Sequence, residues 1–502
     1  MKKPVWYSRA KGDPRAEFVA FSAGRDVVPI LEADSVLIPY DLWTNRSHAV
    51  GLREIGVYTG AECKKVLQAL HQLEREWENG SWKLDPQLED VHINIESRVA
   101  EICGEEISGR LHSGRSRNDQ VACDMKLYAR DVILGFMTES MELIHSLLEH
   151  AGNHADTVMP GYTHHRKATI TSWGHWCASY AQGLLRDMQR FADLYKRINA
   201  CPLGAAAAYG TTWPLDRKLT AKLLAFDGVQ ENTLDAVSSR GEAEAEIVQC
   251  LACLMKRLAC FSQDIILFST EEFGYLALPS DFTTGSSIMP QKRNPDFAEA
   301  IKGKSHVIAG LAQALISIDG ANLSGYNKDV QWSKYLFLDA VREAGGAATI
   351  LANVVMSMTV HADRMEQAAR SGFLNAVDVA DYLARSRRLP FRKTYTLMSE
   401  AVGASTKNYF QFQELNQVLV DHHAALLSSS EFEKLNDPMK CLLSRSHIGS
   451  PNPKQVRRQI QAMKRKSETF QKWIQKQQDF IQSAQKRCRR ALEIEGKQTS
   501  RP

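Results

Sequence analysis

The sequence has little of what marks a membrane or secreted protein, and little that predicts a β-sheet. Its N-terminus, Met1-Lys2-Lys3-Pro4-Val5-Trp6, lacks the apolar core of a signal peptide. No window reaches the roughly 18 apolar residues that a membrane-spanning helix needs. Strand-like alternation of apolar and polar residues is also scarce. These absences predict a cytoplasmic, mainly helical protein that does not contact a membrane.

Cysteine patterns that would hold a metal are also lacking. The ten Cys are scattered and lie mostly inside apolar helical stretches, which is typical of reduced thiols in a cytosolic protein. Cys250-x-x-Cys253 has no second ligand pair at the spacing of a zinc site. We therefore expect no metal ion.

What the chain does have is long helical spacing of apolar residues. Five stretches exceed the average globular helix of about 11–12 residues, and each is expected to be largely uninterrupted: 118–150, 169–200, 240–270, 297–318 and 334–370. Long helices with apolar stripes indicate a bundle. The prediction is an all-α protein with three mainly helical domains and a tail, with boundaries at 1–116, 117–368, 369–453 and 454–502.

The tail differs in charge from the rest of the chain. Residues 454–490 hold twelve Lys or Arg and two Asp or Glu, although the whole chain has a net charge of only +4. Apolar residues recur there every three, four or seven positions, which predicts an amphipathic helix with a basic outer face. Docking on the body or on a neighbouring subunit is the simplest interpretation. Contact of the tail with nucleic acid or another acidic surface, or with a partner helix, is an alternative, although the partners expected for the protein as a whole include no nucleic acid.

Thr283 to Glu299 interrupts the helical pattern. The stretch holds one Gly, two adjacent Ser, two Pro, two cations and an Asn, so it is expected to be a loop. Short hydroxyls, cationic donors and an amide in one loop suit an anion, and could supply a base beside it.

Three further clusters carry polar side chains beside helices. Ser113 to Gln120 opens a long helix with Gly, Ser and Arg, a combination suited to a dicarboxylate. Met159 to Arg166 places a His beside a Thr, where the imidazole could transfer a proton. Gly325 to Lys334 offers donors from Tyr, Gln and Lys.

Together these motifs resemble the argininosuccinate lyase family of the aspartase/fumarase superfamily, over about 41–456. The resemblance implies a carbon–nitrogen lyase that releases fumarate by anti elimination from an N-substituted aspartate. It also implies a homotetramer with a twenty-helix core, in which each site is built from loops of three subunits. The substrate is a small molecule, and no cofactor is needed because the substrate carboxylate is the electron sink.

The resemblance assigns a role to each matching residue. Ser286 is the base, Lys292 and Asn294 stabilise the developing charge, and His164, oriented by Glu299, transfers a proton to the leaving nitrogen. The residues expected to bind substrate are Ser116, Arg117, Asn118, Thr163, Arg166, Ser287, Tyr326, Gln331 and Lys334.

The sequence departs from the family at three positions, of which Arg166 and Ile30 bear on recognition of the leaving amine. Arg166 stands where the family usually has Gln, Gly241 where it has Asp, and Ile30 where it has a Ser four residues before Asp34. Argininosuccinate is the leading substrate. Another N-succinyl amine, such as ethylenediamine disuccinate, is the alternative, and a non-catalytic crystallin-like relative is a third reading.

Overall fold

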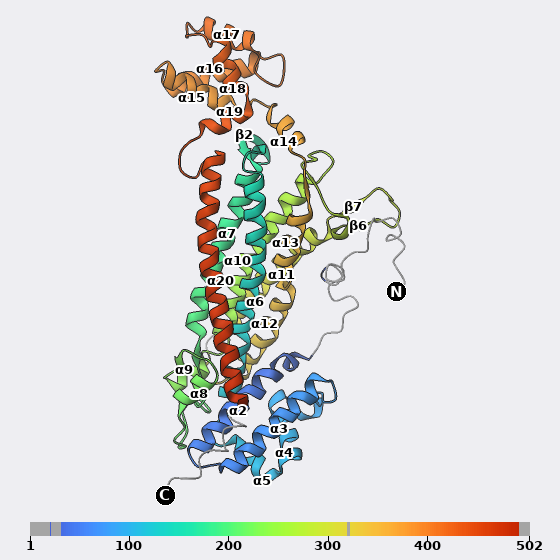
Figure 1. The fold of residues 1–502 in the computed structure, drawn as a ribbon, viewed down its shortest axis with the longest axis vertical. Helices are drawn as coiled ribbons and strands as arrows, with labels where there is room; N and C mark the ends of the chain where they lie inside the picture. The colour runs from blue at the N-terminus through green and yellow to red at the C-terminus, as the bar shows by residue number, and fades with distance from the viewer. Residues whose placement is uncertain (1–20, 22–31, 319–321, 491–502) are drawn as a thin grey trace.

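The structure, a computed structural model, describes residue 21 and residues 32–318 and 322–490. Ile30 and most of the stretch before it lie outside these residues. Long helices run side by side along one axis, with short helices at both ends (Figure 1). The all-α prediction is confirmed, and the division into domains at 116, 368 and 453 stays a prediction.

One end of the molecule is formed by short N-terminal helices, drawn in blue in Figure 1. They are η2 (Ala33–Leu37), α2 (Ile38–Glu54), α3 (Gly60–Glu78), η3 (Pro86–Leu88), α4 (Val91–Cys103), α5 (Glu105–Gly109) and η4 (Arg110–His112). The start of α3 shows why the chain turns helical there. The Thr59 hydroxyl accepts from the backbone N–H of Glu62, whose side chain accepts from Thr59 N, so both orphan donors are satisfied.

The central bundle is formed mainly by α6 (Arg117–Asn153), α7 (Trp173–Ile198), α10 (Glu242–Phe268), α11 (Asp296–Ile318), α12 (Gln331–Ala344) and α13 (Ala347–Ser357). At 1.5 Å per residue, the 37 residues of α6 span about 55 Å. Close helix packing requires Gly174, because a Cβ there would lie 2.6 Å from the carbonyl oxygen of Ala151. The remaining helices of this part are α8 (Arg217–Leu223), α9 (Thr233–Ser238), η5 (Ser280–Phe282), η6 (Lys328–Val330) and α14 (Ala362–Ala369).

Two expectations about long helices are wrong. The stretch 334–370 is divided into α12, α13, β8 (Thr359–Val360) and α14. It breaks at Gly345-Gly346, where Gly346 has a φ of 78° that continues no right-handed helix. The stretch 169–200 begins as a strand, because β1 (Val158–Thr163) and β2 (Arg166–Ser172) form an antiparallel hairpin before α7.

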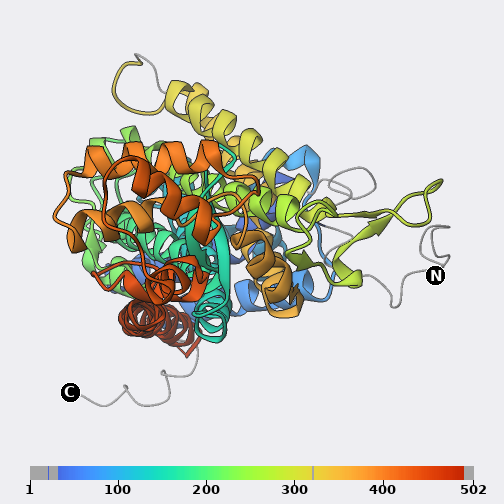
Figure 2. The same cartoon turned by 90° about the horizontal axis from the view of Figure 1, so that it is seen from above.

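Smaller two-stranded pairings connect the loops. β3 (Ala200–Cys201) pairs with β4 (Gly228–Val229), β5 (Leu276–Ala277) with β8, and β6 (Thr284–Gly285) with β7 (Arg293–Asn294). The β6–β7 pair forms the base of an arm, residues 283–295, that projects from the side of the bundle in Figure 2.

The other end holds α15 (Ala376–Ser386), α16 (Phe391–Ala404), α17 (Phe412–Asp421), α18 (Ser429–Asn436) and α19 (Pro438–Ser444) around a small apolar core of their own. From there α20 (Pro453–Arg490) returns along the whole bundle (Figure 1). Its apolar stripe, from Val456 to Cys488, is buried against α6, α7, α2 and α8. The interpretation of a helix docked on the body is confirmed. Among the described helices, none is long and apolar enough to cross a membrane.

Candidate active site

A cavity of about 560 Å³ lies where the N-terminal helices meet the bundle. It is lined by the start of α4, the first turns of α6 and the η6–α12 segment. Five residues predicted to bind substrate lie in its wall: Arg117, Asn118, Tyr326, Gln331 and Lys334. Arg117 and Asn118 lie more than two hundred positions before the other three residues in the sequence, and the fold brings the two groups together.

The beginning of α6 explains how two of these residues are presented. Ser116 is the N-cap: its backbone N–H donates to Asp119 Oδ1 at 2.9 Å, and its hydroxyl accepts from Asn118 N at 3.4 Å. Asp119 also accepts from the backbone N–H groups of Gly204 and Ala206, at 2.8 and 2.9 Å. The helix N-terminus, with its partial positive charge, is thereby fixed beside the cavity.

Arg117 is held by a carboxylate that the sequence analysis missed. Its two terminal nitrogens donate to the two oxygens of Glu96, at 3.1 and 3.0 Å. Glu96 also accepts from His112 and Arg115, both at 3.1 Å. Burial raises the pKa of Glu96, but the hydrogen bond from His112 and the charges of Arg115 and Arg117 outweigh it and hold the pKa well below the ordinary value. Glu96 is therefore ionised and orients Arg117 at the cavity wall.

Lys334 is paired across the cavity with Asp34, the carboxylate that matches the family's N-terminal Asp. The other oxygen of Asp34 accepts from the backbone N–H of Val91 at 3.1 Å. On the same wall, the Arg240 guanidinium lies over the Tyr326 ring, 4.7 Å from its centroid. Gly241 follows with a φ of 92°, a conformation in which the Asp usual in the family would be strained.

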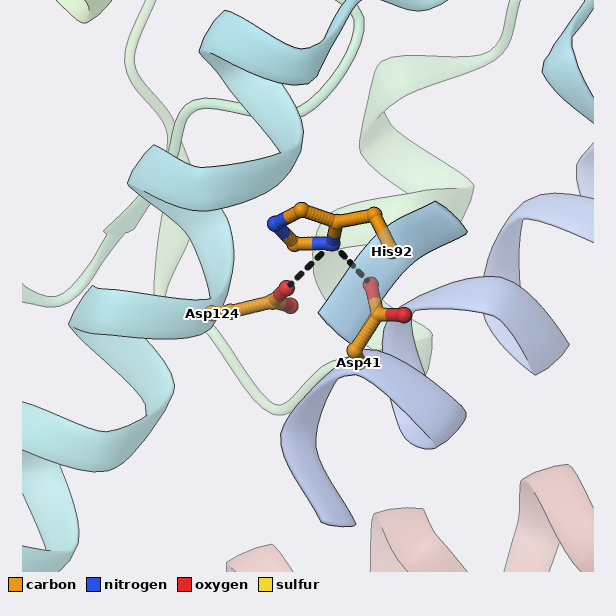
Figure 3. A group of neighbouring side chains, drawn as sticks. All are labelled: Asp41, His92 and Asp124. Atoms are coloured by element: carbon orange, nitrogen blue, oxygen red, sulfur yellow. Dashed lines mark hydrogen bonds and ion pairs between the residues drawn. The ribbon is translucent and has the colours of Figure 1, made fainter. Parts of the chain in front are cut away.

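Beneath the cavity lies a buried cluster of Asp41, His92 and Asp124 from α2, α4 and α6 (Figure 3). His92 Nδ1 lies 2.9 Å from Asp41 Oδ1 and 3.7 Å from Asp124 Oδ2. Gln120 also donates to Asp41 Oδ1, at 2.6 Å, and Thr44 donates to Asp124 Oδ1 at 2.6 Å.

The two carboxyls of this cluster differ in their proton affinity. Burial and the charge of Asp41 raise the pKa of Asp124 well above its ordinary value. Burial also raises the pKa of Asp41, but His92 outweighs it and lowers that pKa. Asp41 is thus ionised and Asp124 neutral. One carboxylate oxygen of Asp41, one of Asp124 and His92 Nδ1 all lie within 4.8 Å of one another, a spacing that would also suit metal ligands. His92 Nδ1 donates to Asp41, whereas Asp124 Oδ2 is buried without a hydrogen-bond partner among the described residues.

The predicted proton-transfer residues lie at the other end of the bundle. Thr163 and Arg166 pair at the tip of the β1–β2 hairpin, and His164 and His165 form the turn between them. Both turn residues have positive φ, 53° and 57°, as in a type I′ turn. The side chains of Thr163, His164 and Arg166 are exposed in one chain.

The β6–β7 arm carries the predicted base. Ser286 Oγ accepts from the backbone N–H groups of Ile288 and Met289, at 3.3 and 3.1 Å. Asn294 Nδ2 lies 3.5 Å from Thr284 Oγ1 within the pairing of β6 and β7. Ser287 and Lys292 are exposed on the arm, and Glu299 is exposed on the first turn of α11. Within the described part of one chain, Glu299 makes no hydrogen bond to His164.

One chain therefore holds the predicted site residues in three separate places: the cavity, the hairpin and the arm. Sequence reasoning missed Glu96, Asp41 and Asp124 because helix packing rather than local spacing brings them to the site, and it interpreted His92 only as part of a helix start. The only available signal was the Glu89-Asp90-Val91-His92 stretch, which places carboxylates beside an imidazole ahead of an apolar helix.

Comparison with known proteins bears on the class of enzyme. Residues 42–310 match the lyase family, and residues 373–442 match the argininosuccinate lyase C-terminal family. The argininosuccinate lyase of Hahella chejuensis is 38% identical over 85% of this chain and 90% of its own length. The structure of an EDDS lyase in complex with formate matches with a TM-score of 0.87 and 26% identity over 98% of both chains. A class II fumarase from Schistosoma mansoni shares the fold, with a TM-score of 0.69 and 15% identity over 89% of this chain and 98% of that one.

The fold and these matches define a fumarate-releasing carbon–nitrogen lyase with the aspartase/fumarase architecture. The chain belongs to the argininosuccinate lyase family. An enzyme rather than a non-catalytic structural relative is thereby shown.

Proposed function

We propose that the protein cleaves argininosuccinate into arginine and fumarate. The observation that carries this proposal is the composition of the cavity, where Arg117 and Lys334 face a rim of carboxylates, Asp85, Glu89 and Asp90. Argininosuccinate carries carboxylates and a guanidinium group, so it needs both signs of charge in one cavity. Cationic donors suit its carboxylates, and a carboxylate accepts two parallel hydrogen bonds from a guanidinium.

The elimination breaks one C–H and one C–N bond and forms the double bond of fumarate. Ser286, as an alkoxide, removes the proton from the carbon next to a carboxylate, and His164 gives a proton to the leaving nitrogen. The two backbone N–H groups aimed at Ser286 Oγ support this role, since such donors stabilise negative charge on oxygen. Lys292 and Asn294 stabilise the charge that develops on the substrate carboxylate.

A homotetramer would complete the site. The separation of cavity, hairpin and arm in one chain supports sites built from three subunits, because no described segment of the same chain joins them. The bundle also offers a surface for association: α11 exposes Val307 and Ile316, and α12 exposes Trp332. We expect an isolated monomer to be inactive. A cytoplasmic location is part of the same proposal.

A second candidate substrate is an aminopolycarboxylate such as ethylenediamine disuccinate. Two observations favour it. The match to the EDDS lyase covers 98% of both chains, so it must include most of the 38-residue α20. Arg166 adds a cation at the hairpin, where an additional substrate carboxylate could bind.

The experiment that decides is a fumarate absorbance assay with purified protein. Argininosuccinate is expected to release fumarate with the highest kcat/KM among a set of N-succinyl amines that includes ethylenediamine disuccinate. Release of fumarate only from the aminopolycarboxylate would replace the first proposal with the second. Analytical ultracentrifugation at the assay concentration tests the tetramer, and full activity in a monomer would exclude shared sites.

A further inference from the structure

The hairpin that carries His164 cannot hold its own shape. An isolated two-stranded hairpin is marginally stable in water. Its turn is also costly: a type I′ turn favours Asn and Gly, whereas His164 and His165 both adopt φ near 55° here. Residues other than Gly keep a positive φ only when contacts with the surrounding structure hold the backbone in place. The direction of the His164 side chain therefore depends on what fixes β1 and β2 from outside.

Arg445, which follows α19, makes that contact. Its Nη1 donates to the carbonyl oxygen of Ile170, and its Nη2 donates to Thr169 Oγ1 at 2.8 Å, both on β2. The same guanidinium binds Asp378 on α15, with Nη2 2.9 and 2.7 Å from the two carboxylate oxygens and Nε 3.2 Å from Oδ1. One side chain thus joins β2, α15 and the end of α19.

The backbone explains why a side-chain donor is needed on β2. Ile170 lies opposite Pro160 in the register of the hairpin. Proline has no N–H, so Pro160 offers the Ile170 carbonyl no donor. Arg445 supplies one from the C-terminal side. A small apolar cluster of β1, β2 and the C-terminal helices surrounds the contact: Val158, Ile170, Ala369, Leu374, Cys441 and Leu442.

The Arg445–Asp378 pair is mostly removed from water, with 17% and 11% of the two side chains exposed in the wall of a cavity beside α15 and α19. Bidentate arginine–carboxylate pairs of this kind fix geometry as well as adding free energy. Removing one partner leaves the other charge without its counter-ion in a mostly buried position. This destabilises the contact between the elements that the pair connects. Lys167 adds a second tie, from Nζ to the carbonyl oxygen of Ala368 at 2.7 Å and to Ser371 Oγ at 3.0 Å.

We propose that Arg445, anchored by Asp378, is a positioning residue that fixes the β1–β2 hairpin on the C-terminal helices and so sets His164 for proton transfer. This rests on the proposed function in one respect, the role of His164. It gives the C-terminal helices a part in the reaction although they hold none of the predicted catalytic residues. Arg445 acts through the hairpin and does not touch the substrate.

Amide hydrogen exchange tests the tie without reference to activity. In the full-length protein, Arg445→Met should speed exchange across residues 158–172 by about tenfold or more, because local opening follows the loss of tertiary contacts. Arg445→Lys keeps the charge but not the bidentate geometry, so its exchange rate should lie between those of the wild type and Arg445→Met. It is also the variant to use if Arg445→Met does not fold. The matched control is Arg457→Met on α20. It removes an exposed ion pair between Arg457 and Asp156, and it should leave the exchange rates of residues 158–172 unchanged. Unchanged exchange in the Arg445 variants would overturn the proposal.

Kinetics test whether the tie acts through His164. Because small misplacements of a catalytic group are costly, Arg445→Met should lower kcat by about 10- to 100-fold while KM changes less than about threefold. In a His164→Gln background the same substitution should cost almost nothing further. An undiminished effect in that background, or a wild-type kcat for Arg445→Met, would count against the proposal. If His164→Gln itself has wild-type activity, the proposed role of His164 fails, and the exchange result alone decides whether Arg445 holds the hairpin.

Discussion

The cavity and the β6–β7 arm both carry residues assigned to the reaction, yet they are built in opposite ways. In the cavity, Arg117 is fixed by Glu96 and Lys334 by Asp34, above the buried network of Asp41, His92 and Asp124. On the arm, residues 287–292 are all exposed, and Ile288 has 83% of its surface in water. The cavity is thus organised within one chain, whereas the arm presents its chemistry outward. The difference suggests a test of the proposed function: if the arm works against a neighbouring subunit, changes on the arm and changes in the cavity should have separable effects on turnover and on substrate binding.

The strongest test of this contrast is removal of the base from the arm. Ser286→Ala should lower kcat by about 10²- to 10⁴-fold, the usual range for a positioned acid or base, and leave substrate binding and the unfolding temperature unchanged. Turnover by fumarate absorbance and binding by calorimetry are the measurements. Ser317→Ala, on the exposed face of α11, is the control and should behave as wild type. If Ser286→Ala retains most of its turnover, Ser286 is not the base.

Substitutions in the buried network beneath the cavity should instead change the stability of the folded protein. Asp41→Asn removes the buried carboxylate that accepts from His92 and Gln120 and leaves these donors mismatched, so the free energy of unfolding should fall by about 3–5 kcal/mol. Asp124→Asn should change it by less than about 1 kcal/mol, because burial and the charge of Asp41 raise the pKa of Asp124 and keep it protonated, much like an amide. Denaturant unfolding of both variants measures the difference, and equal losses would contradict this assignment of charge.

The same pair predicts a pH dependence. A carboxyl whose pKa is raised in the folded state contributes no stability difference below its unfolded pKa, near 4, where it is protonated in both states. Above that value the unfolded chain gains by losing the proton, so stability falls as the pH rises toward the folded pKa. Asp124→Asn should flatten this fall above about pH 4. A fall as steep as in the wild type would mean that another group is responsible.

A smaller effect is expected where the cavity positions substrate. Glu96→Gln weakens the hold on Arg117 and removes a negative charge that Arg115 and His112 also share. KM should rise by about tenfold, roughly 1.4 kcal/mol of binding, with little change in kcat. Glu76→Gln, which loosens the equally exposed Arg98 away from the cavity, is a matched control and should leave KM unchanged. A loss confined to kcat would place Arg117 in the chemical step.

The smallest effect concerns the hairpin, which belongs to neither region. Arg166→Gln restores the residue usual in the family at an exposed position. It should change KM for argininosuccinate by about threefold or less, and raise KM more for an aminopolycarboxylate, which has an additional carboxylate to bind. The ratio of the two kcat/KM values is the measurement. An unchanged ratio would remove Arg166 from substrate choice.

Periodicity predicted the long helices well and the short-range breaks poorly. The apolar spacing before and after Ser286 places α10 and α11 within two residues of their observed ends, because a buried helix face must repeat every three or four residues. The β1–β2 hairpin was missed because Pro160 and Gly161 read as loop residues, and its strands pair with each other rather than in a larger sheet. Gly345-Gly346 was passed over inside an otherwise apolar stretch.

Motifs predicted the polar residues of the cavity, and tertiary contacts decided the rest. Arg117 and Lys334 were expected from their local pattern, but their partners Glu96 and Asp34 are set by helix packing, which no local spacing encodes. Arg445 lies in a segment with no motif at all, and its contact with Ile170 spans 275 positions.

The position of α20 along the bundle has a consequence for folding during synthesis on the ribosome. Arg489 binds Glu74, 415 positions away, and Cys488 contacts the carbonyl oxygen of Leu223. Early helices emerge first, and at 5–20 residues per second the chain needs roughly 25–100 s to reach residue 489. Until then the apolar faces of α6 and α7 lack their cover, so the nascent chain must keep an incomplete bundle from aggregating. A chain cut before Pro453 should therefore accumulate with chaperones or in aggregates, even though every residue assigned to the reaction is present.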